Sequence, residues 1–339
     1  MKKICCFGEL LMRMSPDAQG KWIGNASMPV YLGGAELNVA HALATWKLPV
    51  RYFTALPENN LSRNIQQQLT INGLDTSLIN FSGKRTGIYY LTQGADLKHA
   101  DVIYDRADSS FASLKTGTLD WDMILQDVDW FHFSAISPAL SQQAADVCLE
   151  AVRAAAKKDI TISIDLNYRS KLWKYNKDPK EVMRPFIGYC DVVMGNIWSA
   201  NTLLGIPVDE NIHAKNNRQS YLDHASQTAK DLMELSPECK VVANTFRFDK
   251  DNYINYYAAI NDRSEQYVSV EFNTDKIIDK VGSGDCFMAG LIYGIKKALP
   301  FKQTVSYAAA AAFGKLMEHG DATKNTPDQI ISILNIYGK

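Results

Sequence analysis

The chain has 339 residues, with 36 Lys and Arg against 37 Asp and Glu, so its formal net charge is −1. This balance provides no extended basic surface for a nucleic-acid backbone or an anionic membrane, and we expect neither partner. The length predicts one large α/β domain with an accessory piece, or two domains. Gly8 and Glu9 interrupt the first apolar run too early for a secretory signal, and the six cysteines form no CxxC pair. We therefore expect a cytoplasmic protein with reduced thiols.

Short apolar runs alternate with helical patterns along most of the chain. This alternation predicts a mostly parallel sheet covered by helices on both faces. The C-terminal third is expected to be helical, with Gly320 as the C-terminal cap of its second helix. The expected strands are 4–7, 51–55, 130–134, 160–165, 192–195 and 241–244, and the expected helices are 36–46, 61–72, 141–157, 198–204, 226–235, 284–297, 301–319 and 327–337.

Residues 11–32 and 84–108 do not fit this alternation. They contain short β-like stretches separated by Gly, Asp and Pro. Long insertions of this kind are more often functional covers than structureless loops. We therefore expect a small β-sheet lid formed by these two ranges, and a main α/β domain formed by residues 1–10, 33–83 and 109–339. The exposed edges of such a lid favour pairing between chains, so a homo-oligomer through the lid is expected.

The strongest local motif runs from Asp279 to Asp285 and reads DKVGSGD, directly before an apolar helix. Gly282, Ser283 and Gly284 allow a tight turn with outward-pointing amides, which the positive end of the helix dipole reinforces. Such a turn suits a phosphoryl group. Asp285 is suited to accept a hydroxyl proton while those amides hold the developing charge. On spacing alone, a simple N-terminal capping turn explains the motif equally well.

A second motif, GGAELNVA, places Gly33 and Gly34 just before an expected helix. Paired glycines allow the backbone to approach a ligand closely, and Asn38 follows one turn later, where its amide could bind a sugar hydroxyl. A glycine turn followed by a helix with a solvent-facing asparagine is the simpler interpretation of this motif taken alone.

A third motif, DLNYRSKLW, begins at Asp165 at the carboxyl end of an expected strand, where open α/β sheets bind ligands. Arg169 could hold a carboxylate or phosphate with two hydrogen bonds, or it could pair with Asp165 at the surface. P-loop, dinucleotide-binding, HExxH and GxSxG motifs are all missing from the sequence. His132 lies in an apolar strand pattern and is expected to be a core residue.

Taken together, these motifs resemble the ribokinase-like (PfkB) family of sugar kinases over nearly the whole chain. The family pattern GGxxxNxA is matched by Gly33, Gly34, Asn38 and Ala40. The signature D-T-x-G-A-G-D is matched as DKVGSGD, with Lys280 in place of Thr and Ser in place of Ala.

This resemblance implies a ribokinase-like α/β fold with a lid, and ATP and Mg²⁺ as cofactors. It also implies that Asp285 is the base and that Gly282, Ser283 and Gly284 form the anion hole. Asp279 would help to organise a site for a monovalent cation such as K⁺. Lid closure would exclude water from the transfer reaction.

Within the family, the chain is most similar to the 2-keto-3-deoxygluconate kinases. The segments TGIY, ending at Tyr89, and YDR, from Tyr104 to Arg106, match lid motifs of these enzymes, and NYRSKLW matches their NxRxxLW motif. An acid sugar needs cationic partners for its carboxylate, which Arg106 and Arg169 would supply, while Tyr89 and Tyr104 would orient the hydroxyls. The implied reaction is ATP-dependent phosphorylation of the 6-hydroxyl of 2-keto-3-deoxygluconate.

Two segments depart from the family pattern on the expected nucleotide side. The NxxE motif reads NIWS, with Ser199 at its end, and the stretch 243–248 lacks the family's glycines. Asn196, Asn244 and Arg247, with Gly282 and Gly284, are then the expected nucleotide contacts. A fructokinase or another neutral-sugar kinase shares much of the pattern. The departures also motivate a different class of function, a catalytically silent regulator that binds a sugar or a nucleotide.

Overall fold

The computed structural model describes residues 1–16, 20–24, 27–92, 102–215, 217–250 and 253–338. Within these residues, nine strands form one sheet in the order β14-β13-β12-β11-β10-β9-β1-β4, with β15 paired to β13. Six neighbouring strands, from β4 to β12, are parallel, and the three remaining strands are antiparallel. The strands are β1 (Lys3–Phe7), β4 (Val50–Phe53), β9 (Val128–Ser134), β10 (Thr161–Asp165), β11 (Val192–Gly195), β12 (Val241–Lys250), β13 (Tyr253–Asn261), β14 (Gln266–Val268) and β15 (Phe272–Thr274).

The central strands are apolar along their whole length because each supplies two hydrophobic cores. In β1, Ile4 and Cys6 belong to one core, whereas Cys5 and Phe7 belong to the other. Successive side chains of a strand point to opposite faces of the sheet, so this sequence pattern requires cover on both sides. The expected parallel sheet between two helical layers is therefore confirmed.

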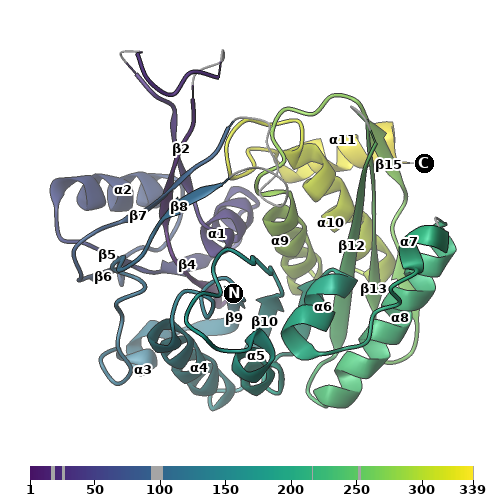
Figure 1. Cartoon of the computed structure of the whole chain (residues 1–339), viewed down its shortest axis with the longest axis horizontal. Coiled ribbons are helices and arrows are strands. Elements are labelled where there is room, and N and C mark those ends of the chain that lie inside the picture. Colours follow the sequence, from purple (N-terminus) through teal and green to yellow (C-terminus); the bar gives the residue numbers. More distant parts are fainter. Residues whose placement is uncertain (17–19, 25–26, 93–101, 216, 251–252, 339) are drawn as a thin grey trace.

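Helices cover both faces of this sheet (Figure 1). One face carries α1 (Ala35–Thr45), α2 (Asn60–Ile71), α9 (Ser283–Lys296), α10 (Phe301–Lys315) and α11 (Pro327–Tyr337). The other carries α3 (Trp121–Ile124), α4 (Gln142–Ala156), α5 (Pro179–Ile187), α6 (Ile197–Leu204) and α8 (Arg218–Leu235), and the short α7 (Ile212–Lys215) lies against α8.

Four strands form a second sheet, separate from the main one, in the order β3-β2-β7-β8. Figure 1 shows β2 extending beyond the main body of the fold. The strands are β2 (Leu11–Met14), β3 (Val30–Gly33), β7 (Gly87–Tyr90) and β8 (Ile103–Asp105), and a two-stranded sheet pairs β5 (Ala55–Leu56) with β6 (Asn80–Phe81). All four strands of the second sheet fall within or next to the predicted lid ranges, which also include residues 17–19, 25–26 and 93–101, outside the described residues.

Some sequence predictions were wrong in the C-terminal half. The antiparallel strands β13–β15 and helix α5 were not predicted, and α8 begins at Arg218 rather than 226, with Asn217 as its N-cap. Helix α10 ends at Lys315 instead of 319, so Gly320 lies in the following loop, with φ of 90°, and is not the cap. The helix ends early because the Leu316 carbonyl accepts hydrogen bonds from the backbone amides of Ile278 and Asp279.

Other expectations are confirmed. All six cysteines are buried free thiols. His132 is fully buried, with Nδ1 3.0 Å from the Ser163 hydroxyl, and burial lowers its pKa to about 3, as suits a neutral core residue. Among the described helices, none combines the length and the apolar character needed to cross a membrane.

Close packing of α9 on α10 positions the start of α9. A Cβ atom at Gly290 would lie 2.6 Å from the Cα atom of Ala308, so the two helices would have to separate. We expect Gly290→Ala to lower the free energy of unfolding by about 1–3 kcal/mol in urea titrations. Gly188→Ala is the matched control, because a Cβ there meets nothing within 4 Å and its φ of −63° suits any residue. Equal stability of the two variants would contradict this packing.

Candidate active site

A cleft opens at the carboxyl ends of the parallel strands, between the main sheet and the four-stranded second sheet. Asp165 ends β10 and Gly195 ends β11, while the first residues of α1 and α9 face the same space. The second sheet contributes Leu11, Tyr89 and Tyr104. Ligands bind at this edge in open α/β sheets, so the topology itself places the site here.

The turn before α9 forms a cradle of backbone amides. Gly282 has φ of 78°, and a Cβ atom there would overlap the carbonyl oxygen of Asp321, so the position requires glycine. In the described part of the chain, the amides of residues 283–285 donate to no acceptor, and a Cβ at Gly284 would meet nothing within 4 Å. The Ser283 hydroxyl instead donates to the Ala312 carbonyl at 2.9 Å. The expected anion hole is thus available as main-chain amides at a helix N-terminus.

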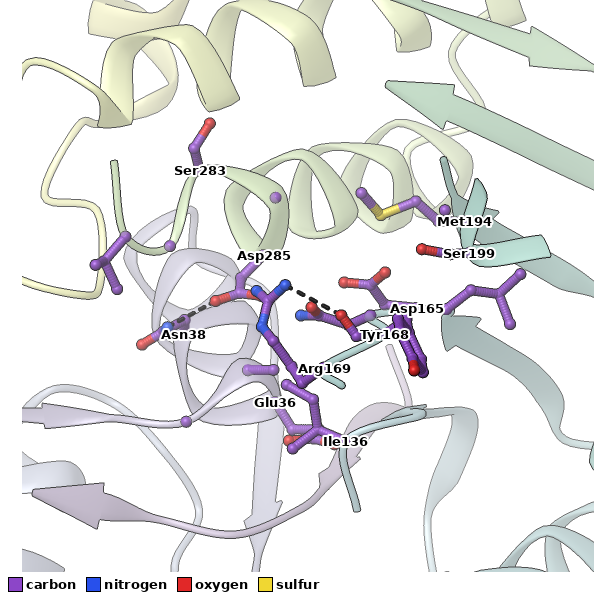
Figure 2. A pocket seen from close by; sticks show the side chains of 18 of the residues that line it. Glu36, Asn38, Ile136, Asp165, Tyr168, Arg169, Met194, Ser199, Ser283 and Asp285 are labelled. Carbon is purple, nitrogen blue, oxygen red and sulfur yellow. Dashed lines mark hydrogen bonds between the residues drawn. The ribbon is translucent and has the colours of Figure 1, made fainter. Parts of the chain in front are cut away.

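Asp285 lies in the first turn of α9 with only 8% of its surface exposed. Asn38 Nδ2 donates to its Oδ2 at 2.7 Å, and Figure 2 shows Arg169 on the same side of the cleft. Burial raises the pKa of Asp285 to about 7, although the Asn38 hydrogen bond and the positive charge of Arg169 both act to lower it. A carboxylate with this pKa can accept a proton near neutral pH.

The residues of the GGxxxNxA motif have different surroundings. Asn38 lines the cleft and is 4% exposed, so it is not a solvent-facing helix residue. Gly34 also lines the cleft, with φ of 137°, and a Cβ there would overlap the Glu9 carbonyl. Gly33 lies behind the cleft, where a Cβ would overlap a carboxylate oxygen of Asp321. Because Gly33 has no side chain, β3 can pack closely against Asp321.

The two arginines expected to bind a carboxylate differ in their partners. Arg106 lines the cleft, but its guanidinium forms a buried ion pair with Glu9, with Nε 2.8 Å from Oε2. Arg169 is partly exposed, and within the described residues its one hydrogen bond goes to the Tyr168 carbonyl at 3.4 Å (Figure 2). Arg169 is therefore the better placed of the two to bind an incoming anion.

The two lid tyrosines also differ. Both line the cleft, and their rings lie 6.3 Å apart. The Tyr89 hydroxyl donates to a carboxylate oxygen of Asp321, so it links β7 of the second sheet to the loop after α10. Tyr104 packs its ring 5.8 Å from the Arg106 guanidinium carbon.

The expected nucleotide residues are only partly brought to the cleft. Asn196 lines it, while its side chain also caps α6 by accepting the Ser199 amide at 2.8 Å. Arg247 lines it and lies 3.3 Å from Asp249. Asn244 is buried instead, and its side-chain amide donates to the Gly195 carbonyl at 3.1 Å, joining β12 to β11.

A scan of protein-family descriptions matches residues 1–225 and 256–328 to the family described as pfkB family carbohydrate kinase. The chain belongs to the pfkB family of carbohydrate kinases. It is accordingly an ATP-dependent carbohydrate kinase with the ribokinase-like fold expected from its motifs.

The matches to named relatives extend over almost the whole length of the kinase. A 2-dehydro-3-deoxygalactonokinase from Haloferax volcanii is 27% identical over 98% of this chain and 96% of its own length. A 2-dehydro-3-deoxygluconokinase from Bacillus subtilis is 25% identical over 93% and 90%. The crystal structure of a 2-dehydro-3-deoxygluconokinase from Thermotoga maritima superimposes with a TM-score of 0.89 and 32% identity, covering 98% of each chain.

Several cleft residues of the kinase were missed as functional candidates. Glu9 and Asp321 belong to no motif, and only their long-range partners in the lid reveal them. Lys280 lines the cleft and pairs with Asp249 at 2.6 Å, although in the sequence it is only a departure from the family signature. Trp198 lines the cleft and stacks on His213 with 5.1 Å between ring centroids.

The raised pKa of Asp285 has a consequence for stability. Because the folded state holds the proton more tightly than the unfolded state, this carboxyl destabilises the fold increasingly as pH rises through about 7. We expect Asp285→Asn to be more stable than wild type at about pH 9, by up to roughly 4 kcal/mol, and to lose that advantage by about pH 4. Urea titrations across this pH range measure it, with Asp223→Asn on the exposed face of α8 as the control. Parallel pH profiles for Asp285→Asn and wild type would contradict the buried carboxyl.

Proposed function

We propose that this kinase transfers the γ-phosphoryl group of ATP to the 6-hydroxyl of 2-keto-3-deoxygluconate. The observation that carries the proposal is the grouping of three features in one cleft: the buried carboxyl of Asp285, the amides at the start of α9, and the cationic Arg169. The similarity to a 2-dehydro-3-deoxygluconokinase of known structure supports the same substrate class.

In this proposal Asp285 accepts the proton of the sugar hydroxyl as its oxygen attacks the γ-phosphorus. The new O–P bond forms while the bond between the γ-phosphorus and the bridging oxygen of ADP breaks, and ADP leaves. The amides of residues 283–285 stabilise the negative charge on the transferring group. Asn38 fixes the orientation of the Asp285 carboxylate through its 2.7 Å hydrogen bond.

The donor set on the nucleotide side fits a magnesium ion. Asp165 lines the cleft at the end of β10, where it pairs with Met194 of β11, and Ser199 lines the same cleft (Figure 2). Mg²⁺ is commonly held by one or two carboxylates together with substrate phosphates, so Asp165 would hold it here in place of the glutamate that Ser199 replaces. When bound, the ion would offset the charge of the nucleotide phosphates.

Lys280 and Arg247 add positive charge on the same side of the cleft, where both contact Asp249. The lid strands β7 and β8 would cover the bound sugar and exclude water. The homo-oligomer through the lid stays a prediction, and Val30 and Ile103 on its two edge strands are more than half exposed.

A coupled assay of ADP formation over a panel of sugars tests the substrate. We expect turnover of 2-keto-3-deoxygluconate, with product analysis locating the phosphate on carbon 6, and Asp285→Asn to lower kcat by about 10²–10⁴-fold. The galactonate epimer belongs in the panel because a relative is named for it. Preferred turnover of fructose would favour a neutral-sugar kinase. A ligand-induced rise in unfolding temperature without ADP formation would favour a silent regulator.

The unequal surroundings of the two arginines give a sharper test of acid-sugar binding. Arg169→Met should raise KM for the acid sugar by about 10–100-fold, because a hydrogen bond between charged groups is lost. The free energy of unfolding should stay unchanged. Arg106→Met should instead lower the free energy of unfolding by about 3–5 kcal/mol, because Glu9 is left buried and unpaired. Steady-state kinetics and urea titrations separate the two effects. Equal loss of affinity for acid and neutral sugars in Arg169→Met would argue against a carboxylate contact.

A further inference from the structure

Two loops support the anion hole from behind. The backbone amides of Ile278 and Asp279 donate to the Leu316 carbonyl at 2.8 and 3.2 Å. The turn at Gly282 packs directly on the Asp321 carbonyl, with no room for a side chain. The position of the amides of residues 283–285 therefore depends on the groups held between these loops.

A lysine ammonium is buried at this junction. Lys315, the last residue of α10, has no exposed surface, and its Cε atom lies 3.5 Å from where a Cβ of Gly282 would be. Its Nζ donates to the Glu318 carbonyl at 3.2 Å. Burial lowers the pKa of Lys315, whereas the negative charges of Asp279, Glu318 and Asp321 raise it. Fully buried lysines are rare unless they have anionic partners, so this ammonium calls for an explanation.

A second buried cation contacts two of these acids, Asp279 and Asp321. Arg13 of β2 has no exposed side-chain surface, and its Nη2 lies 2.7 Å from Asp279 Oδ2. Its Nε lies 2.9 Å from Asp321 Oδ1, and its guanidinium carbon is 4.5 Å from the centre of the Tyr31 ring. The two carboxylates thus contact Arg13 directly, and the Lys315 ammonium acts on both of them electrostatically.

This arrangement does not fit the monovalent cation expected at Asp279. One carboxylate oxygen of Asp279 is paired with Arg13, and the other accepts the Val281 amide at 3.1 Å. A hard cation needs several oxygen ligands at once. Because the Arg13 guanidinium lies 2.7 Å from Asp279 Oδ2, it would repel a metal ion bound to this carboxylate. An added metal ion would also bring a third positive charge to a junction that already holds those of Arg13 and Lys315.

We propose that the Lys315 ammonium takes the place of a monovalent metal ion behind the anion hole. An ammonium is a compact point charge that binds carbonyl and carboxylate oxygens, as K⁺ does. Lys315 is a positioning residue in this proposal, because it acts through the 279–282 turn and does not touch the substrate. Only the activity readout below rests on the proposed function.

The first test uses the unmodified protein. Its unfolding temperature and its kinase rate are measured in potassium, sodium and tetramethylammonium chloride at equal ionic strength. We expect less than about a twofold change in rate and no saturable rise in unfolding temperature with either metal ion. A rate that requires K⁺, or an unfolding temperature that rises with K⁺ along a binding curve, would overturn the proposal. Because the unfolding measurement needs no sugar, it stands even if the assigned substrate is wrong.

The second test removes the charge. Lys315→Met keeps the length of the side chain but removes one of the two buried positive charges that act on Asp279 and Asp321. We expect a lower unfolding temperature in tetramethylammonium and a partial, saturable recovery with K⁺ or NH₄⁺, in the rate as well as the temperature. Lys296→Met, which breaks the pair with Asp129 at the far end of α9, is the matched control and should show no such recovery. A folded Lys315→Met protein that is indifferent to both cations would refute the proposal, and if this variant does not fold, the first test still decides.

Discussion

The site depends on one steric constraint, the contact between the main chain of Gly282 and the carbonyl of Asp321. This contact leaves no space for a side chain and fixes the turn before α9 in a left-handed conformation. It orients the first amides of the helix toward the cleft and places Asp285 where Asn38 can bind it. Burial at this position gives the carboxyl a pKa suited to proton transfer, at the expense of stability above neutral pH.

Much of the fold could be predicted because the parallel strands are apolar on both faces and alternate with helices. The antiparallel strands β13–β15 were missed because polar residues such as Asn255 and Asn273 interrupt their apolar pattern. The end of α10 could not be predicted either, since it is set by hydrogen bonds from residues 278 and 279, which are distant in the sequence. Local periodicity contains no information about such partners.

The candidate site, like the fold, could be predicted only in part from the sequence. Motif spacing and family resemblance brought Asp285, Asn38 and Arg169 to one cleft, and the structure has all three there. The same reasoning treated Arg106 as equivalent to Arg169, because nothing near Glu9 in the sequence indicates that it pairs with a residue 97 positions away. Asn244 was expected at the nucleotide because it lies in the stretch 243–248, where the family has its glycines, but its side chain joins two strands instead of facing the ligand.

Arg13 also ties the second sheet to the catalytic turn. It belongs to β2, yet its guanidinium is fixed to Asp279 and Asp321 at the base of the catalytic turn. The root of β2 is therefore anchored to the main domain by two buried ionic contacts, which are costly to break. Opening of the cleft should accordingly leave the root of β2 and the phosphoryl cradle in place. A displacement of β7 and β8 would have to break the buried contacts of Tyr89 with Asp321 and of Arg106 with Glu9.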